Sequence, residues 1–124
     1  MKQEIIQLFT EKEEAFSSLL IGIGMQKRSA RVLVYLANIR EATSREIERG
    51  ADMRQPEVSV GVRFLEKQGW VKHRQIPSRG HGRPLNIFSL AVPIKEIITA
   101  IDQQKTEETS RRLEMVKRMR TFVG

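Results

Sequence analysis

Two short helices joined by a tight turn are predicted in the middle of the chain, and this arrangement restricts the possible folds more than any other feature. Thr43 and Glu46 have the T-x-x-E spacing of a capping box at a helix start, and Gly50 is a typical helix end. Pro56 suits the first turn of a second helix, and Gly69 suits its end. The predicted unit is therefore a helix of about two turns, a turn and a second helix.

The second helix, over about residues 55–68, is predicted to bury one face. Val58, Val62 and Leu65 share one stripe at helical spacing. The residues that point away from this stripe are Gln55, Pro56, Ser59, Val60 and Arg63. They differ from the usual Lys/Glu solvent face, and they are residue types that can read base edges in a major groove.

A basic hairpin is predicted directly after these helices. Residues 70–76 and 85–90 contain the aromatic and β-branched residues that favour strands. The loop between them, "PSRGHGRP", has glycines that let the backbone turn and prolines that end the two strands. The basic residues of this segment are Lys72, His73, Arg74, Arg79, His81 and Arg83, and no acid interrupts them between Trp70 and Pro84. Such a segment is favoured beside a phosphate backbone.

Helix, turn, helix and hairpin in this order predict a winged helix-turn-helix, a mainly α fold with a small β-hairpin wing (α+β). In that fold the second helix enters the major groove of DNA, and the basic wing, residues 72–85, lies on the backbone or in the minor groove. The residues expected to contact DNA are Arg54, Gln55, Pro56, Ser59, Val60, Arg63, Lys67, Lys72, Arg74, Arg79, His81 and Arg83. An ordinary solvated helix face and loop are the alternative interpretation of the same side chains.

Four segments together resemble the winged-helix domain of MarR/TrmB/ArsR-type transcriptional regulators, namely "GMQKRSARVLVYLANI", "EATSREIERGADM", "PEVSVGVRFLEKQGWV" and "GRPLNIFSL", over about residues 24–90. The resemblance implies a homodimeric DNA-binding repressor or activator whose dimer is made by helices outside the winged core. It indicates no particular small-molecule effector, because the effector domain of larger TrmB proteins and the thiolates of metal-sensing ArsR proteins are missing. The sequence departs from the family at Arg54-Gln55-Pro56, where a small hydroxyl residue usually caps the helix, and this could shift the contacts by one residue.

Helices are also predicted on both sides of the winged domain, which is expected over residues 24–92. Its own first helix, "QKRSARVLVYLANI", should be the central helix of the core, because its second half has little polar surface. For residues 2–21 we expect one helix, although Thr10 and Glu13 form another T-x-x-E pair that would divide it into two.

A long C-terminal helix is expected because residues 94–123 contain no glycine or proline. Its second apolar cluster comprises Leu113, Met115, Val116, Met119 and Phe122. A small domain cannot bury this cluster together with the isoleucines at the start of the helix, so residues 1–23 and 93–124 are expected to form a homodimer interface.

The composition favours an anionic partner, because the net charge is +7 and the pI is about 10.2. Nucleic acid comes first and an anionic membrane second. The chain has no cysteine, and no segment approaches the roughly 20 apolar residues of a membrane helix, so a soluble, cytoplasmic protein is expected.

No enzyme activity, metal or cofactor is expected. His73 and His81 have no neighbouring carboxylate or thiolate in the sequence. Glu11, Glu13 and Glu14 are expected on a solvated helix face rather than in an acid–base site.

Three alternatives to a double-stranded DNA regulator remain open. The main one is a winged-helix protein-interaction module without base-specific DNA binding, since this fold serves several functions. A structured RNA is another possible partner, although few exposed aromatic residues are available for stacking. Finally, the basic and apolar C-terminal segment could lie on a membrane surface.

Overall fold

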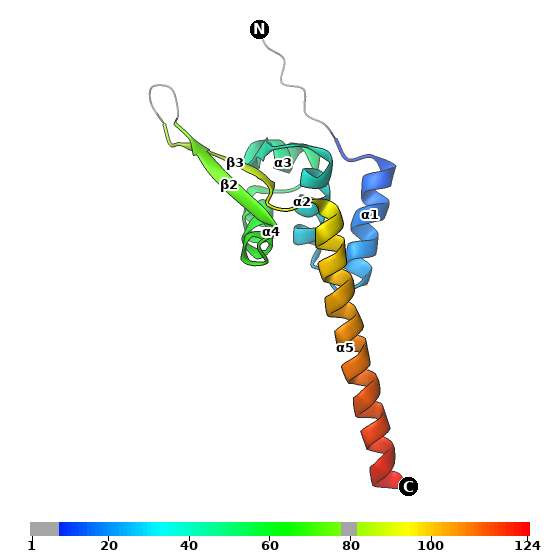
Figure 1. The fold of residues 1–124 in the computed structure, drawn as a ribbon. Helices are drawn as coiled ribbons and strands as arrows, with labels where there is room; N and C mark the ends of the chain where they lie inside the picture. Colours follow the sequence, from blue (N-terminus) through cyan, green and yellow to red (C-terminus); the bar gives the residue numbers. More distant parts are fainter. Residues whose placement is uncertain (1–7, 78–81) are drawn as a thin grey trace. The chain divides into compact units, whose positions relative to one another are not determined.

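The computed structural model describes residues 8–77 and 82–124, and the chain divides into two compact units, residues 1–92 and 93–124. The elements of the described residues are α1 (Glu11–Gly22), α2 (Lys27–Asn38), β1 (Ala42–Thr43), α3 (Ser44–Gly50), α4 (Gln55–Lys67), β2 (Val71–Ile76), β3 (Leu85–Leu90) and α5 (Ile94–Val123) (Figure 1). Helices with a small antiparallel sheet are the α+β arrangement that the sequence predicts.

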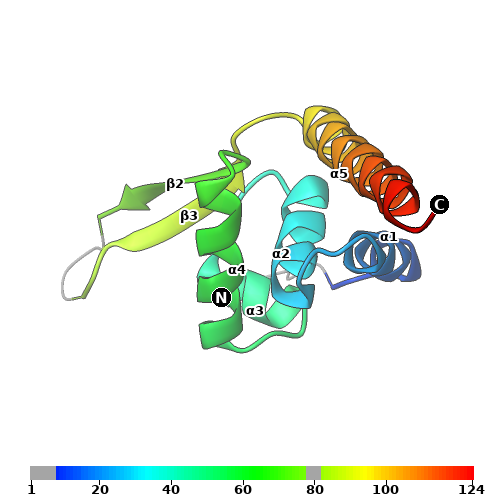
Figure 2. The same ribbon diagram turned by 90° about the horizontal axis from the view of Figure 1, so that it is seen from below.

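Helix α2 is the centre of the first unit. Every residue from Ser29 to Leu36 is buried, so all sides of the helix are covered over about two turns. Helix α1 packs against one side of α2 and α4 against another, as Figure 2 shows. The fully buried Leu33, Ile47 and Leu65 bring α2, α3 and α4 into one core. The prediction of a central helix surrounded by its neighbours is confirmed.

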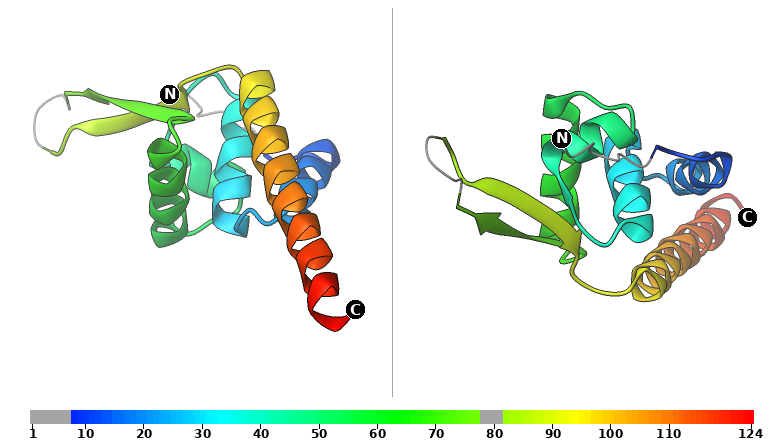
Figure 3. Two further views of the ribbon diagram at one scale, coloured as in Figure 1. Left: turned by 60° about the horizontal axis from the view of Figure 1, so that its bottom comes forward. Right: turned by 90° about the horizontal axis from the view of Figure 1, so that it is seen from above.

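The predicted hairpin is present and forms most of a three-stranded antiparallel sheet with the order β1-β3-β2. Strands β2 and β3 pair from Val71 with Leu90 to Ile76 with Leu85, and the hairpin extends away from the helices (Figure 3). Its inner end is anchored in the core, since the side chains of Val71 and Phe88 are buried.

The short strand β1 is not predicted by the sequence, because two residues are too few to show an alternating pattern. Ala42 pairs with Phe88 and Thr43 with Ile87. Thr43 is also the N-cap of α3, where its Oγ1 accepts a hydrogen bond from the Glu46 amide at 3.2 Å. The base of the hairpin is therefore tied directly to the start of the helix-turn-helix.

Helix α4 begins at Gln55 and ends at Lys67, within one residue of the predicted range. Arg54 occupies the N-cap position, and its guanidinium has no acceptor for the helix amides. Glu57 accepts a hydrogen bond from the Arg54 amide at 3.0 Å, and the first turn of α4 lies in the expected place. Gly69 ends the helix with φ +81°, a conformation in which glycine lacks the steric cost of a side chain.

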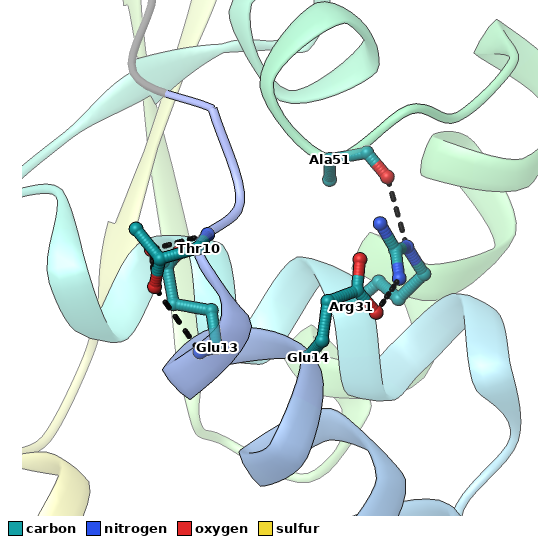
Figure 4. A network of polar contacts seen from close by, with 5 residues as sticks. All are labelled: Thr10, Glu13, Glu14, Arg31 and Ala51. Atoms are coloured by element: carbon teal, nitrogen blue, oxygen red, sulfur yellow. Dashed lines mark hydrogen bonds and ion pairs between the residues drawn. The ribbon is translucent and has the colours of Figure 1, made fainter.

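Helix α1 begins at Glu11, so the expectation of one helix over residues 2–21 is wrong. Residues 8–10 are not helical, and residues 2–7 lie outside the described part of the chain. The Thr10 Oγ1 accepts from the Glu13 amide at 3.3 Å, and a Glu13 carboxylate oxygen accepts from the Thr10 amide at 3.2 Å (Figure 4). The T-x-x-E pair therefore marks a helix start, and the apolar periodicity that continued through it was misleading.

The carboxylates of α1 do not all lie on a solvated face, which corrects a second expectation. Glu11 is exposed as expected, but Glu13 is buried because its carboxylate folds back on the capping backbone. Glu14 accepts a 2.8 Å hydrogen bond from Arg31 of α2, a buried guanidinium that requires a counter-ion (Figure 4).

Helix α5 is one uninterrupted helix of 30 residues, as predicted (Figure 1). The apolar side chains of its C-terminal part are exposed, namely Leu113, Met115, Val116, Met119, Phe122 and Val123. No helix in the described residues combines the length and the apolar character needed to cross a membrane.

Candidate nucleic-acid interface

A groove of about 680 Å³ lies between α3, α4 and the hairpin. Its floor includes the apolar side chains of Val58, Val62 and Phe88. The polar side chains that line it are Thr43, Ser44, Arg45, Glu48, Gln55, Ser59, Arg63, Glu66, His73 and Asn86. The groove thus combines hydrogen-bonding groups with both cationic and anionic side chains.

Helix α4 presents the predicted polar face to this groove and to solvent. Gln55, Ser59 and Arg63 are spaced four residues apart, so they form one row along the helix, and all three line the groove. The other predicted residues of this region, Arg54, Pro56, Val60 and Lys67, are exposed but are not part of the groove lining.

The position of α4 is fixed by a close backbone approach to α2. Gly61 lies on the buried face of α4, and a Cβ atom at this position would lie 2.7 Å from the carbonyl oxygen of Arg28 and 3.0 Å from a methyl carbon of Val32. A separation of 2.7 Å is too short for a carbon–oxygen contact, so this helix crossing requires a residue without a side chain.

The hairpin carries the predicted basic residues, and the structure modifies their electrostatics. Lys72, Arg74 and Arg83 are exposed, whereas Arg79 and His81 lie outside the described residues. The Nη2 atom of Arg74 lies 3.1 Å from both carboxylate oxygens of Glu41. Arg74 is therefore paired with a carboxylate, although no acid neighbours it in the sequence, and solvent screens this exposed pair.

His73 has a carboxylate neighbour, so the expectation that it has none is wrong. Its Nδ1 lies 3.0 Å from Oε1 of Glu66, and its ring centroid is 5.9 Å from that of Phe88. The turn after α4 folds β2 back along the helix, which brings together residues seven positions apart. A single carboxylate does not make a metal site, and the described residues contain no cluster of three or more ligands suited to one.

Seven polar residues that line the groove are absent from the predicted contact set, namely Thr43, Ser44, Arg45, Glu48, Glu66, His73 and Asn86. Ser44 and Arg45 follow the cap of α3 directly, and Asn86 lies on β3 opposite Gln75. The capping box predicted where α3 begins, but not that its first turn would face α4 and the wing. Within the described residues neither Arg45 nor Arg63 forms an ion pair with a carboxylate, so both can meet an anion.

A helix-turn-helix with a polar row on the outer side of its second helix, followed by a basic hairpin, is a winged helix-turn-helix, the arrangement of many DNA-binding proteins. The sequence matches the MarR family over residues 23–84, which is half of the chain. The chain belongs to this family. It is accordingly a DNA-binding transcriptional regulator and not an enzyme, and regulators of this family typically act as dimers.

Solved structures show the same fold at low sequence identity. A possible transcriptional regulator from Methanosarcina mazei Go1 has a TM-score of 0.61 at 17% identity, covering 78% of this chain and 80% of that one. The archaeal chromatin protein TrmBL2 has a TM-score of 0.66 at 20% identity, covering 90% of this chain but only 40% of that protein. A MarR family transcription regulator has a TM-score of 0.53 at 19% identity, covering 83% and 66%. No curated protein matches the sequence.

Proposed function

We propose that the protein binds double-stranded DNA in a sequence-dependent manner, with α4 in the major groove and the hairpin on the adjacent backbone or minor groove. The observation that carries this proposal is the row formed by Gln55, Ser59 and Arg63 on the exposed side of a helix whose other side is core. The major groove of B-DNA is about 12 Å wide and admits one such helix.

The chemistry of the row assigns a role to each side chain. Arg63 can donate two hydrogen bonds to guanine, Gln55 can pair with adenine, and Ser59 can bond to several bases. Pro56 and Val60 are exposed beside the row and can contact a thymine methyl group.

The flanking cations are suited to phosphates, which fix the register of a protein on DNA without reading its sequence. They are Arg54, Lys67, Lys72, Arg74 and Arg83, together with Arg45 of the groove and the predicted Arg79 and His81 of the wing tip. The ion pair with Glu41 leaves Arg74 with donors to spare, because a guanidinium has five.

A dimer is the second part of the proposal, and α5 offers a surface for it. From residue 94 to 110 the helix carries four carboxylates and two lysines, whereas from 111 to 123 it carries five cations and one carboxylate. Two copies of α5 that run antiparallel would therefore place unlike charges opposite each other. The exposed stripe of Met115, Met119 and Phe122 supplies apolar contact in such a pair.

Helix α1 offers a second apolar surface for contact between two copies of the chain, because Leu19, Ile21 and Ile23 are exposed near its C-terminal end. A two-fold dimer would present two α4 helices to DNA, with half-sites about 10 base pairs apart or at a multiple of that spacing.

Selection of bound duplexes from a random pool tests the DNA proposal. We expect recovery of a palindrome, and affinity for it that falls steeply with salt because bound phosphates release counterions. In the variant Arg63→Gln the preference at one position of each half-site should relax, at a cost of about 1–3 kcal/mol. The matched control is Arg40→Gln, the same exchange at an exposed arginine outside the groove. No enrichment of any duplex would instead favour the protein-interaction module.

Sedimentation velocity tests the dimer. Met119→Glu places a charge within the exposed apolar stripe and should shift the protein toward monomer, whereas Thr121→Glu, on another side of the same helix, should not. A Met119→Glu variant that remains fully dimeric would exclude this stripe as the interface. Binding of the wild type to anionic vesicles, weakened by the same substitution, would favour a membrane surface as the partner.

A further inference from the structure

The turn between α3 and α4 is held by residues from outside the helix-turn-helix. The last carbonyl groups of a helix have no partner within it and must be satisfied elsewhere. At the end of α3 the Gly50 carbonyl accepts from the Phe9 amide at 3.0 Å. The Ala51 carbonyl accepts from Nε of Arg31 at 2.8 Å (Figure 4). The segment before α1 and a side chain of α2 thus supply hydrogen-bond donors to the end of α3.

Arg31 is the centre of this arrangement. Its Nη1 donates to Glu14 at 2.8 Å, and its guanidinium lies over the Phe9 ring, 4.3 Å from the centroid. The Phe9 ring in turn stacks on Tyr35 at 6.3 Å. One planar cation therefore contacts the α3–α4 turn, the first turn of α1 and the segment before it.

The α3–α4 turn contains a non-glycine residue with positive φ. Asp52 has φ +53°, the left-handed conformation that glycine adopts more easily, although Asp tolerates it better than most residues. The Met53 amide donates to the Glu48 carbonyl at 2.8 Å, which is the long bond of a Schellman-type helix end. Helix α4 starts only two residues after Met53, so a change in this turn changes the direction in which α4 leaves it.

We propose that Arg31 is a positioning residue for DNA recognition: it fixes the α3–α4 turn to the N-terminal segment and thereby sets the orientation of α4. This inference rests on the proposed function. Arg31 is 9% exposed, so its guanidinium is unavailable to phosphates and acts through the turn. Lysine at this position keeps the charge. Its ammonium group lacks the planar set of donors with which the guanidinium binds the Ala51 carbonyl and the Glu14 carboxylate at the same time.

Loosening the α3–α4 turn should reduce the selectivity for base sequence without changing the charge of the protein. A loosely held α4 still neutralises phosphates, but it meets base edges at poorer geometry. Arg31→Lys should lower the ratio of specific to non-specific duplex affinity by about tenfold, the scale of one mismatched base pair, with non-specific affinity unchanged. Glu14→Gln keeps the shape of the Arg31 partner while removing its charge, so a smaller loss in the same direction is expected.

The control is Arg40→Lys, the same exchange at an exposed arginine outside the groove, which should leave the ratio unchanged. If Arg31→Lys lowered specific and non-specific affinity by the same factor, Arg31 would have only a structural role and the inference would be overturned. A variant in which both affinities equal those of the wild type would overturn it as well. A wild type that prefers no duplex refutes the proposed function itself, whereas a selective wild type with equally selective variants refutes only the role of Arg31.

Hydrogen exchange provides a readout that needs no DNA. The amides of Ala51 and Met53, which donate to Ile47 and Glu48, should exchange faster in Arg31→Lys while the amides of α2 keep their protection. Unchanged exchange at Ala51 and Met53 would show that Arg31 does not hold the turn. If Arg31→Lys does not fold, the same exchange measurement on Glu14→Gln tests the inference.

Discussion

Replacing Gly61 by alanine tests how α4 is seated on α2. The added methyl group would lie 2.7 Å from the Arg28 carbonyl oxygen and 3.0 Å from both the Arg28 carbonyl carbon and a Val32 methyl. Two of these three atoms belong to the backbone, so the strain cannot be relieved by a side-chain rotation alone. The helices must move apart, which also loosens the packing around Val58 and Leu65.

Two effects of opposite sign decide how much the substitution changes the free energy of unfolding. Overfilling a well-packed contact costs about 1–3 kcal/mol, while alanine in place of glycine inside a helix regains about 1 kcal/mol. Because the closest atoms are backbone, the cost should fall in the upper part of its range. We therefore expect a net destabilisation of about 1–2 kcal/mol, or roughly 4–8 °C in Tm for a chain of this size.

Urea unfolding followed by circular dichroism, at one fixed protein concentration, measures this change. The control is Gly22→Ala at the end of α1, where a Cβ atom would meet nothing within 4 Å. Its stability should equal or slightly exceed that of the wild type. A Gly61→Ala variant as stable as the wild type would refute the close-contact argument.

Three further substitutions have defined outcomes. Thr43→Ala removes the acceptor of the Glu46 amide and should cost about 1 kcal/mol in urea unfolding, so an unchanged midpoint would contradict a stabilising cap. Burial, with the carboxylates of Glu46 and Glu13, raises the pKa of Tyr35, so the folded state favours the neutral phenol. That contribution to stability is complete below the unfolded pKa of about 10 and is lost as the pH rises through the folded value. Tyr35→Phe should therefore flatten the alkaline fall in stability, and parallel pH profiles would exclude this cause. Glu66→Gln removes a negative charge from the groove and should tighten duplex binding at low salt, unlike Glu11→Gln at the exposed start of α1. Equal affinities would show that Glu66 lies far from the phosphates.

The elements that could be predicted from the sequence are those whose signals are local. The capping box at Thr43 and the glycine at 69 gave α3 and α4 nearly their true bounds, because each signal acts within a few residues. At Thr10 the same kind of signal competes with an apolar periodicity that begins earlier in the chain, and the periodicity predicts a helix start before the observed one at Glu11. Cap chemistry was the better guide there, since the Thr10 pair satisfies specific backbone groups.

The electrostatics of the candidate site could not be predicted in the same way. Arg74 and Glu41 are 33 positions apart, and Arg31 and Ala51 are 20 apart. A charged residue in a sequence gives no indication of which distant partner the fold will bring to it. The basic character of the wing was therefore foreseen, while the pairing of its side chains with Glu41 and Glu66 was not.

The strand order of the sheet determines when the sheet can form during synthesis of the chain. The central strand, β3, is the last element of the first unit to be synthesised, so β1 and β2 have no partner strand until residues 85–90 have left the ribosome. At about 5–20 residues per second, both helices of the helix-turn-helix are available for seconds before the sheet can close. A chain that ends before Leu90 would thus have its helices without a completed wing, and only the arrival of Phe88 joins the two parts.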